Sequence, residues 1–158
     1  MTTFSIYSKE QFELVKSSRN VLFDFCKRIS HGDFINQNTS FGRGGSMRNL
    51  LVHIANTYQY WIGNLVLNND IRFSEYEEFK NISDVMELFD QVDEFMDEFI
   101  KNMDAYKDID YEIQNIKSSA KPFKIFTHVI THEYHHKGQV LSISRHLNYT
   151  PFDTDIMR

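Results

Sequence analysis

An apolar stripe runs through the last part of the chain, from Pro122 to Leu147. Its members recur at steps of three or four residues, the spacing of the core-facing side of an amphipathic helix. The stripe consists of Ile125, Val129, His132, His136, Val140, Ile143 and Leu147. Two histidines therefore take core-facing positions on one turn of a predicted helix.

The same spacing predicts three earlier helices, over residues 8–31, 46–65 and 83–106. Ser8 and Gln11 match a capping box, Ser46 is a typical N-cap, and Pro122 suits the first turn of the last helix. His31 and His146 fall in predicted last turns, where a cation favours the helix dipole. The buried faces are predicted to carry Phe12, Val15, Leu22, Cys26 and Ile29; Met47, Leu51, Ile54, Tyr58, Trp61 and Leu65; and Val85, Leu88, Val92, Phe95, Phe99 and Met103.

Two further features complete this pattern. Arg19 interrupts the first stripe, so its side chain must either reach solvent or form an ion pair. The alternating run over 111–116 is typical of a short strand or hairpin. Because strand signals are otherwise sparse and no repeat is present, the sequence predicts an all-α fold, a four-helix bundle in a single domain over residues 1–158.

Length and charge limit the possible functions. With 158 residues and 41% apolar content, the chain can build one core. The net charge is −5, and the third predicted helix turns an acidic face to water, which argues against nucleic-acid binding. That face consists of Asp84, Glu87, Asp90, Asp93, Glu94, Asp97 and Glu98.

The sequence also favours a cytoplasmic protein without a membrane partner. No apolar segment approaches the roughly 18 residues that span a bilayer, and the N-terminus does not resemble a signal peptide. Cys26 is the single cysteine, so no internal disulfide can form. We expect it to be buried in the first helix.

The histidines point to a metal site. His132 and His136 lie four residues apart, so their side chains project from one helix face, where one cation can bind both imidazoles. His53 flanks the stripe of the second helix and is placed to reach a neighbouring helix. Three neutral imidazoles leave coordination positions open, as in catalytic sites, whereas closed structural zinc sites are usually rich in cysteine.

Two other motifs of the sequence bear on its function. Residues 132–136 satisfy the His-Glu-x-x-His pattern of zinc peptidases, in which Glu133 would be the general base. Ser142 stands where a third histidine would follow, and no glutamate comes later to serve as a ligand, so a peptidase is the less favoured reading. The glycine-rich loop over 36–45 lacks the Gly-Lys-Ser/Thr ending of a phosphate-binding loop.

Two segments carry a family resemblance. The run from Ser46 to Trp61, SMRNLLVHIANTYQYW, and the run from Phe126 to Gln139, FTHVITHEYHHKGQ, resemble the DinB-like superfamily of metal-binding four-helix proteins. The resemblance covers most of the chain. It implies a divalent metal, most often zinc or nickel, held by His53, His132 and His136. Characterised relatives include thiol-dependent S-transferases and an isomerase that use a low-molecular-weight thiol.

The chain departs from the family pattern at two positions. Lys137 stands where arginine is usual and keeps the charge. Tyr58 stands where many members have an acidic residue, which removes a possible contact near the site. The relatives' reaction therefore cannot simply be assigned to this chain.

Several residues are candidates for the surroundings of the metal or for a pocket. They are His128, His135, Glu133, Tyr58 and Gln139, with Tyr60, Trp61 and Tyr134 as further aromatic candidates. Gly138 lies in a helix interior, which favours close packing against another helix, of the same chain or of a second subunit in a homodimer.

We therefore expect an open three-histidine site that serves a metal-dependent transferase or hydrolase. Its substrate is expected to be a small electrophile, with a thiol as possible co-substrate. A non-catalytic metal- or ligand-binding module of the stress response is the alternative, and a third possibility is that the histidines are structural and bind no metal.

Overall fold

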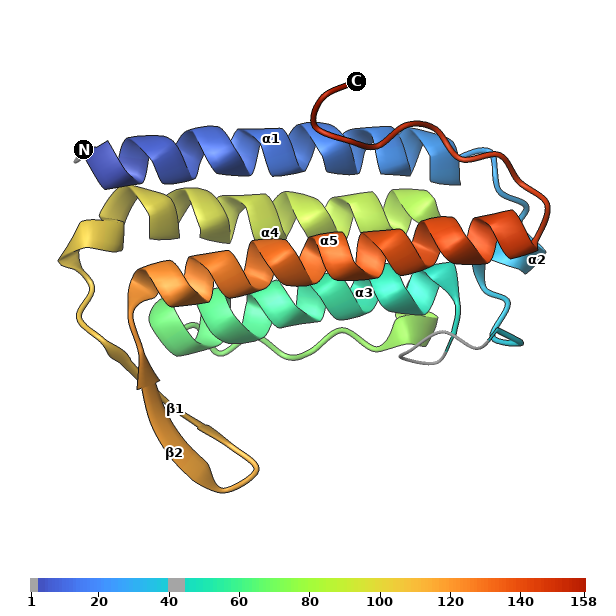
Figure 1. Ribbon diagram of the computed structural model, residues 1–158. Coiled ribbons are helices and arrows are strands. Elements are labelled where there is room, and N and C mark those ends of the chain that lie inside the picture. Colours follow the sequence, from blue (N-terminus) through green and yellow to red (C-terminus); the bar gives the residue numbers. More distant parts are fainter. Residues whose placement is uncertain (1–2, 40–44) are drawn as a thin grey trace.

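The computed structural model describes residues 3–39 and 45–158. Residues 40–44, the centre of the glycine-rich loop, lie outside the described residues. Four long helices lie side by side (Figure 1): α1 (Thr3–Cys26), α3 (Met47–Tyr58) with its continuation η1 (Gln59–Val66), α4 (Ile82–Asn102) and α5 (Pro122–His146). Shorter elements are α2 (His31–Phe34), the 3₁₀ turns η2 (Tyr76–Glu78) and η3 (Met103–Ala105), and strands β1 (Ile109–Ile113) and β2 (Ile116–Ala120).

The long helices enclose one apolar core. α1 packs against α4 and α5, and α3 packs against the same two helices. The predicted stripes face this core: Phe12, Leu51, Val92 and Val129 are fully buried. Trp61, Leu65, Phe95 and Leu147 at the ends or edges of the stripes are only partly buried. Cys26 is buried in the last turn of α1, as predicted.

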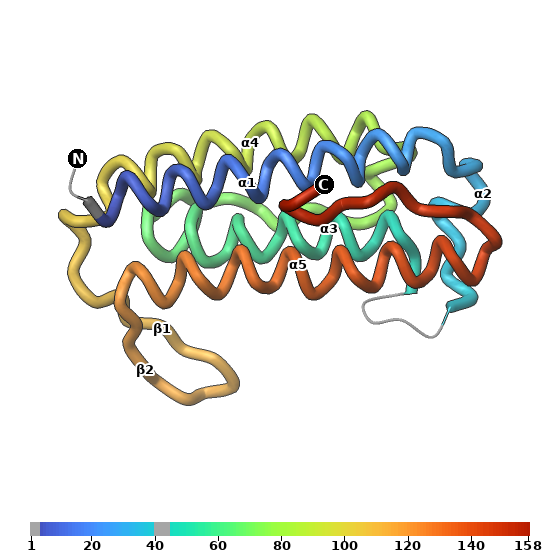
Figure 2. Tube along the Cα trace, turned by 45° about the horizontal axis from the view of Figure 1, so that its top comes forward, coloured from blue at the N-terminus to red at the C-terminus, as the bar shows by residue number. Residues whose placement is uncertain are grey.

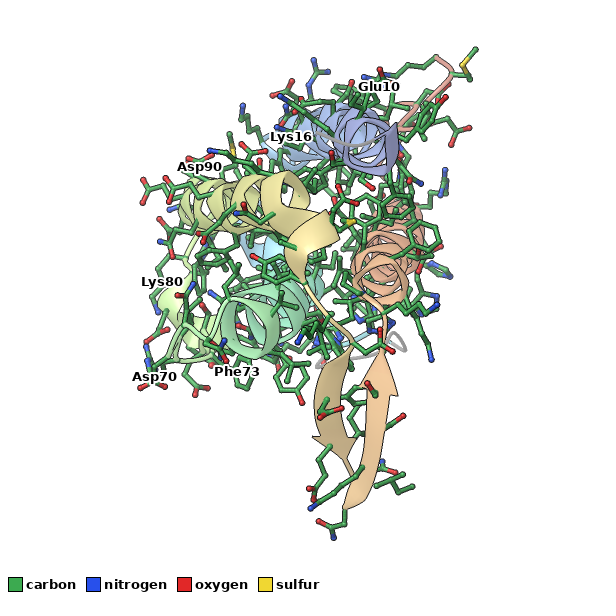
Figure 3. All side chains as sticks on the ribbon, turned by 90° about the vertical axis from the view of Figure 1, so that its left-hand side faces the viewer. Glu10, Lys16, Asp70, Phe73, Lys80 and Asp90 are labelled. Atoms are coloured by element: carbon green, nitrogen blue, oxygen red, sulfur yellow. The ribbon has the colours of Figure 1, made fainter. Side chains whose placement is uncertain are left out.

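The prediction of an all-α bundle is confirmed only in part, because a mostly helical structure also contains a small sheet. β1 and β2 pair in antiparallel register, with Ile113 opposite Ile116. Gln114 and Asn115 at the turn both have positive φ, the geometry of a tight two-residue hairpin turn. The hairpin extends away from the helices (Figures 1 and 3).

The start and end of the first helix were predicted wrongly. α1 begins at Thr3, so Ser8 lies inside it and caps nothing. It ends at Cys26, and His31 begins α2 instead of closing α1. The physical reason is a local cap: the Ser30 side chain accepts a hydrogen bond from the Asp33 backbone N–H and starts a new helical turn.

The connection over 67–81 runs back along α3, so that α3 and α4 point in the same direction (Figures 1 and 2). Two asparagines hold it in place. The Asn64 side chain makes hydrogen bonds of 2.8 and 2.9 Å with the backbone of Ile71, and the Asn56 side chain makes two of 2.9 Å with Ser74. A Cβ atom on Gly63 would lie 2.6 Å from the Ile71 side chain, so glycine permits this close approach.

In the described ranges, every helix falls short of the length and apolar character that crossing a membrane requires.

Candidate metal centre

Three histidines from two helices meet on one side of the bundle. His53 comes from α3, and His132 and His136 come from successive turns of α5. Each offers one ring nitrogen such that the three atoms lie within 4.8 Å of one another. The structure thus brings together the three residues singled out as metal ligands, and this arrangement can hold a metal ion.

The ring orientation of His136 suits metal binding. Its Nδ1 atom lies 2.7 Å from Oε1 of Gln139. An amide oxygen accepts hydrogen bonds, so this contact favours the tautomer in which Nδ1 carries the proton and Nε2 is the metal-binding atom. This Nε2 lies 3.1 Å from Nε2 of His132. Two nitrogens bound at about 2.0–2.1 Å to a tetrahedral zinc ion would be roughly 3.3 Å apart, so the spacing fits a shared cation.

His132 is held in its neutral form. Burial, and then the neighbouring histidines His136 and His53, lower its pKa to about 3. Its Nδ1 is buried and finds no hydrogen-bond partner among residues 3–39 and 45–158. A neutral imidazole is the form that binds metals. The donor set therefore fits a divalent transition metal.

Gln139 and His135 adjoin the cluster on the solvent side of α5. The Gln139 Nε2 atom lies 3.3 Å from Nε2 of His135, while its oxygen holds His136. The His135 ring stands edge-on to His136, with centroids 4.8 Å apart. Gln139 thus fixes the His136 ring, as residues around metal ligands commonly do.

His128 lies on the other side of His132 along α5. Its ring centroid is 5.9 Å from that of His132 and 5.2 Å from that of Trp61. Burial lowers the pKa of His128, which favours its neutral form. Both His128 and His135 therefore neighbour the cluster, although each remains exposed to solvent.

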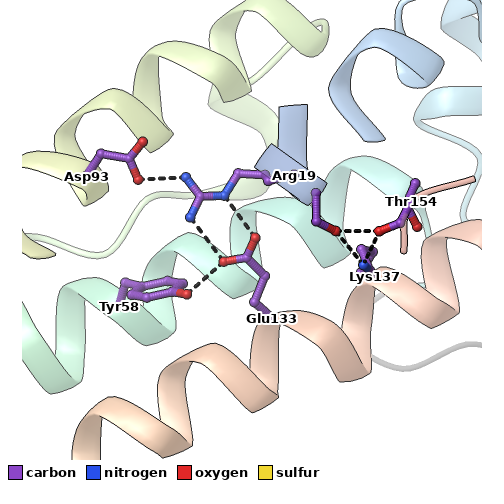
Figure 4. Close-up of polar contacts among 7 residues, drawn as sticks. Arg19, Tyr58, Asp93, Glu133, Lys137 and Thr154 are labelled. Atoms are coloured by element: carbon purple, nitrogen blue, oxygen red, sulfur yellow. Dashed lines mark hydrogen bonds and ion pairs between the residues drawn. The ribbon is translucent and has the colours of Figure 1, made fainter. Parts of the chain in front are cut away.

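Glu133 and Tyr58 face the core. They do not surround the three histidines, contrary to the expectation from the sequence. The Glu133 carboxylate accepts hydrogen bonds of 2.9 and 3.1 Å from Arg19 and one of 2.7 Å from the Tyr58 hydroxyl (Figure 4). Arg19 also pairs with Asp93 at 2.6 Å. Of the two outcomes expected for Arg19, exposure to solvent or an ion pair, the structure shows the ion pair. Asp93 was predicted to face water, yet it turns to the buried guanidinium.

The protonation states of this network follow from its geometry. Burial opposes the charge of Arg19, but Glu133 and Asp93 outweigh it and raise the Arg19 pKa. Burial and the Glu133 charge raise the pKa of Tyr58, so its hydroxyl stays protonated and donates. Glu133 is thus engaged as an acceptor on both oxygens and is badly placed to act as the general base of a peptidase.

Lys137 ties the C-terminal segment to the bundle. Its Nζ donates to Oγ of Ser18 at 2.6 Å and to the Thr154 carbonyl at 2.9 Å (Figure 4). Next to it, Gly138 is exposed, and a Cβ atom there would meet nothing within 4 Å in the described chain. Close packing of Gly138 against a helix of the same chain was therefore a wrong expectation, and packing against a second subunit stays a prediction.

A cavity of about 480 Å³ opens beside His53. The back-folded connection forms one wall and α3 with η1 forms the other, and the lining residues are His53, Asn56, Thr57, Tyr60, Trp61, Phe73, Ser74, Glu75 and Tyr76. Tyr60 and Trp61 were candidates for a pocket, and both line it, whereas Tyr58 and Tyr134 do not. The residues over 73–76 were not foreseen, since their approach depends on the asparagine contacts with the connection.

A second, smaller cavity of about 230 Å³ lies between the hairpin and α5. Trp61 and His128 line it together with Tyr111 of β1. Trp61 therefore borders both cavities.

The fold and these residues define a mostly helical protein with a three-histidine candidate metal centre beside a cavity that His53 lines. The model of the DinB family matches residues 1–158, and the chain belongs to the DinB family. No curated protein matches the chain. Family membership confirms the resemblance found in the segments around His53 and His132.

Proposed function

We propose that this protein binds one divalent cation through His53, His132 and His136 and uses it in chemistry on a small electrophile. The observation that carries the proposal is the meeting of three ring nitrogens, from two helices, within 4.8 Å and next to a cavity. Imidazole ligands suit zinc or nickel. Three neutral ligands would leave a position for water or substrate.

The proposed reaction is a transfer that uses a low-molecular-weight thiol. A divalent cation with open positions lowers the pKa of a bound thiol or water and so supplies a nucleophile at neutral pH. The protein's own thiol is unsuited to this role, because Cys26 is buried and burial raises its pKa to about 12. A thiol nucleophile would therefore have to come from a co-substrate.

Hydrolysis by a metal-bound water is the other reaction that such a site supports. Peptide hydrolysis is disfavoured by the position of Glu133, whose carboxylate is held by Arg19 and Tyr58 inside the bundle. The residue that a zinc peptidase needs beside its metal thus lies in the core.

The test begins with the metal content of protein purified without a tag and without added metal. About one zinc or nickel per chain is expected in the wild type, with much less in His132→Ala. Turnover is then measured with a panel of thiols and electrophiles, before and after metal removal. Stoichiometric metal with no turnover would replace the enzyme proposal by the non-catalytic binding module. Absence of metal even after reconstitution would contradict the metal site itself.

A further inference from the structure

The cavity beside His53 has an aromatic end with a single carboxylate. Tyr60, Trp61, Phe73 and Tyr76 supply four rings, and Glu75 supplies the charge. Neither lysine nor arginine lines the cavity among residues 3–39 and 45–158. An acidic, ring-lined space of this kind repels anions and attracts organic cations, which the faces of aromatic rings bind.

The rings stand in different planes. Tyr60 and Trp61 meet edge to face with centroids 5.1 Å apart, and Tyr60 and Phe73 are tilted at 6.2 Å. In the Tyr60–Trp61 pair the edge of one ring lies against the face of the other, so a guest can contact only the ring surface that lines the cavity. The two walls of the cavity thus both offer aromatic ring surface to a cationic group.

The wall that carries Phe73 and Glu75 is fixed by the bundle. The Asn56 side chain makes two hydrogen bonds of 2.9 Å with the backbone of Ser74, which lies between Phe73 and Glu75 in the sequence. Because this wall is already ordered, a ligand does not lose binding free energy in ordering it.

The charge of Glu75 is only partly offset by Arg72, which acts on it through space. Arg72 pairs with Glu78, and Arg48 lies 3.8 Å from Glu77. In the part of the chain that the structure describes, no lysine or arginine forms an ion pair with Glu75. Its side chain caps η2, which uses only part of the acceptor capacity of a carboxylate.

We propose that the aromatic end of this cavity binds an organic cation, such as a quaternary ammonium group, carried by the substrate. Tyr60 lies seven residues beyond His53, about 10 Å along the helix. The substrate would then place its cationic group between Tyr60 and Glu75 and its reacting group near His53. This names the substrate class of the site proposed above and rests on it for the reaction, but cation binding itself needs no metal.

Trp61 makes the proposal directly measurable. It is the only tryptophan of the chain and lines the cavity, so its fluorescence reports on a bound guest. Choline is the probe, in metal-free protein. Its matched controls are the uncharged alcohol in which carbon replaces the nitrogen, and the carboxylate with the same branched end. We expect saturable quenching by choline, about tenfold weaker binding of the alcohol, and no response to the carboxylate.

Two cavity variants and one distant variant sharpen the test. Glu75→Gln should weaken choline binding severalfold and leave the alcohol unaffected, whereas Phe73→Ala should weaken choline more than the alcohol. Glu10→Gln removes a carboxylate from the far side of the molecule and should change neither (Figure 3). Melting curves confirm that each variant is folded.

Equal binding of choline and the alcohol, tight binding of the carboxylate, or unchanged choline binding in Glu75→Gln would overturn the proposal. So would the lack of any saturable response to choline. Metal content is measured on the same protein. Choline binding without metal binding would support the cation site and contradict the proposed function. Metal binding without choline binding would support the metal site and contradict the cation site.

Discussion

Arg19 of α1 and Glu133 of α5 form a two-point ion pair in the centre of the bundle, with N–O distances of 2.9 and 3.1 Å. Both side chains are almost wholly buried. His132, the residue before Glu133, turns instead to His53 of α3. One turn of α5 thus carries the ion pair on one side and the candidate metal ligands on the other. The ion pair thereby fixes the orientation of the helix that carries the two histidines.

We predict that Glu133→Gln lowers the free energy of unfolding by about 3 kcal/mol, because it leaves the buried charge of Arg19 with Asp93 alone. Metal stoichiometry and much of any thiol-dependent activity should remain. Denaturant unfolding and metal analysis provide the measurements. Asp93→Asn is the matched control and should cost less, since Asp93 is partly exposed.

Glu133→Gln also distinguishes the proposed thiol-dependent enzyme from a zinc peptidase. Neither the wild type nor Glu133→Gln should hydrolyse peptides. Metal-dependent peptide cleavage by the wild type that disappears in the variant would establish Glu133 as a base and contradict its structural role.

We predict that His132→Ala and His136→Ala each abolish tight metal binding, because two remaining imidazoles hold a cation too weakly. Metal content after dialysis is the measurement. His146→Ala, which removes an exposed histidine from the end of the same helix, should retain the wild-type content. Full stoichiometry in both cluster variants would refute their assignment as ligands.

His53→Ala tests the contribution of α3. A ligand that binds only the folded state raises the melting temperature by mass action, so the loss of one imidazole should shrink the increase that saturating metal produces. Melting curves with and without zinc report the effect. An identical increase in wild type and variant would show that His53 does not bind the metal.

Gln139→Ala should weaken metal affinity roughly ten- to a hundredfold while stoichiometry at saturation is kept, because the His136 ring loses the acceptor that orients it. Competition with a chelator of known affinity measures the change. Gln139→Glu keeps an acceptor at this position and should restore most of the affinity. If alanine and glutamate behave alike, the hydrogen bond has no influence on the metal.

The metal-free protein should lose stability as the pH falls. The pKa of His132 is lowered from 6.5 to about 3 in the folded state, so below about pH 6.5 the unfolded chain takes up a proton that the folded site refuses. Stability therefore falls from about pH 6.5 toward pH 3, by at most about 1.4 kcal/mol per pH unit from this one group.

Unfolding by denaturant at pH 7 and pH 5.5 measures this slope before most carboxylates titrate. His132→Gln should flatten it, and His31→Gln serves as the control for an exposed histidine. A slope that is the same in wild type and in His132→Gln would contradict the argument.

Local periodicity was sufficient to predict the long helices and the paired histidines of α5. The spacing of His132 and His136 fixes their shared face in any helix, because side chains four residues apart always project together. The hairpin was also predictable from its alternating run. The C-terminal end of α1 was not, because the turn at Ser30 is held partly by hydrogen bonds of Ser30 and Asp33 with Tyr149, which is distant along the chain.

Everything that depends on contacts between elements was decided by the tertiary structure. His53 joins His132 and His136 only because α3 packs on α5, and the Glu133 carboxylate finds its buried partner only because Arg19 enters the core from α1. The wall formed by 73–76 likewise has no periodic pattern in the sequence. The side chains of Asn56 and Asn64 hold that wall through hydrogen bonds to backbone atoms that are distant along the chain. Sequence periodicity specifies which face a residue occupies, whereas its partner is set by how the faces pack.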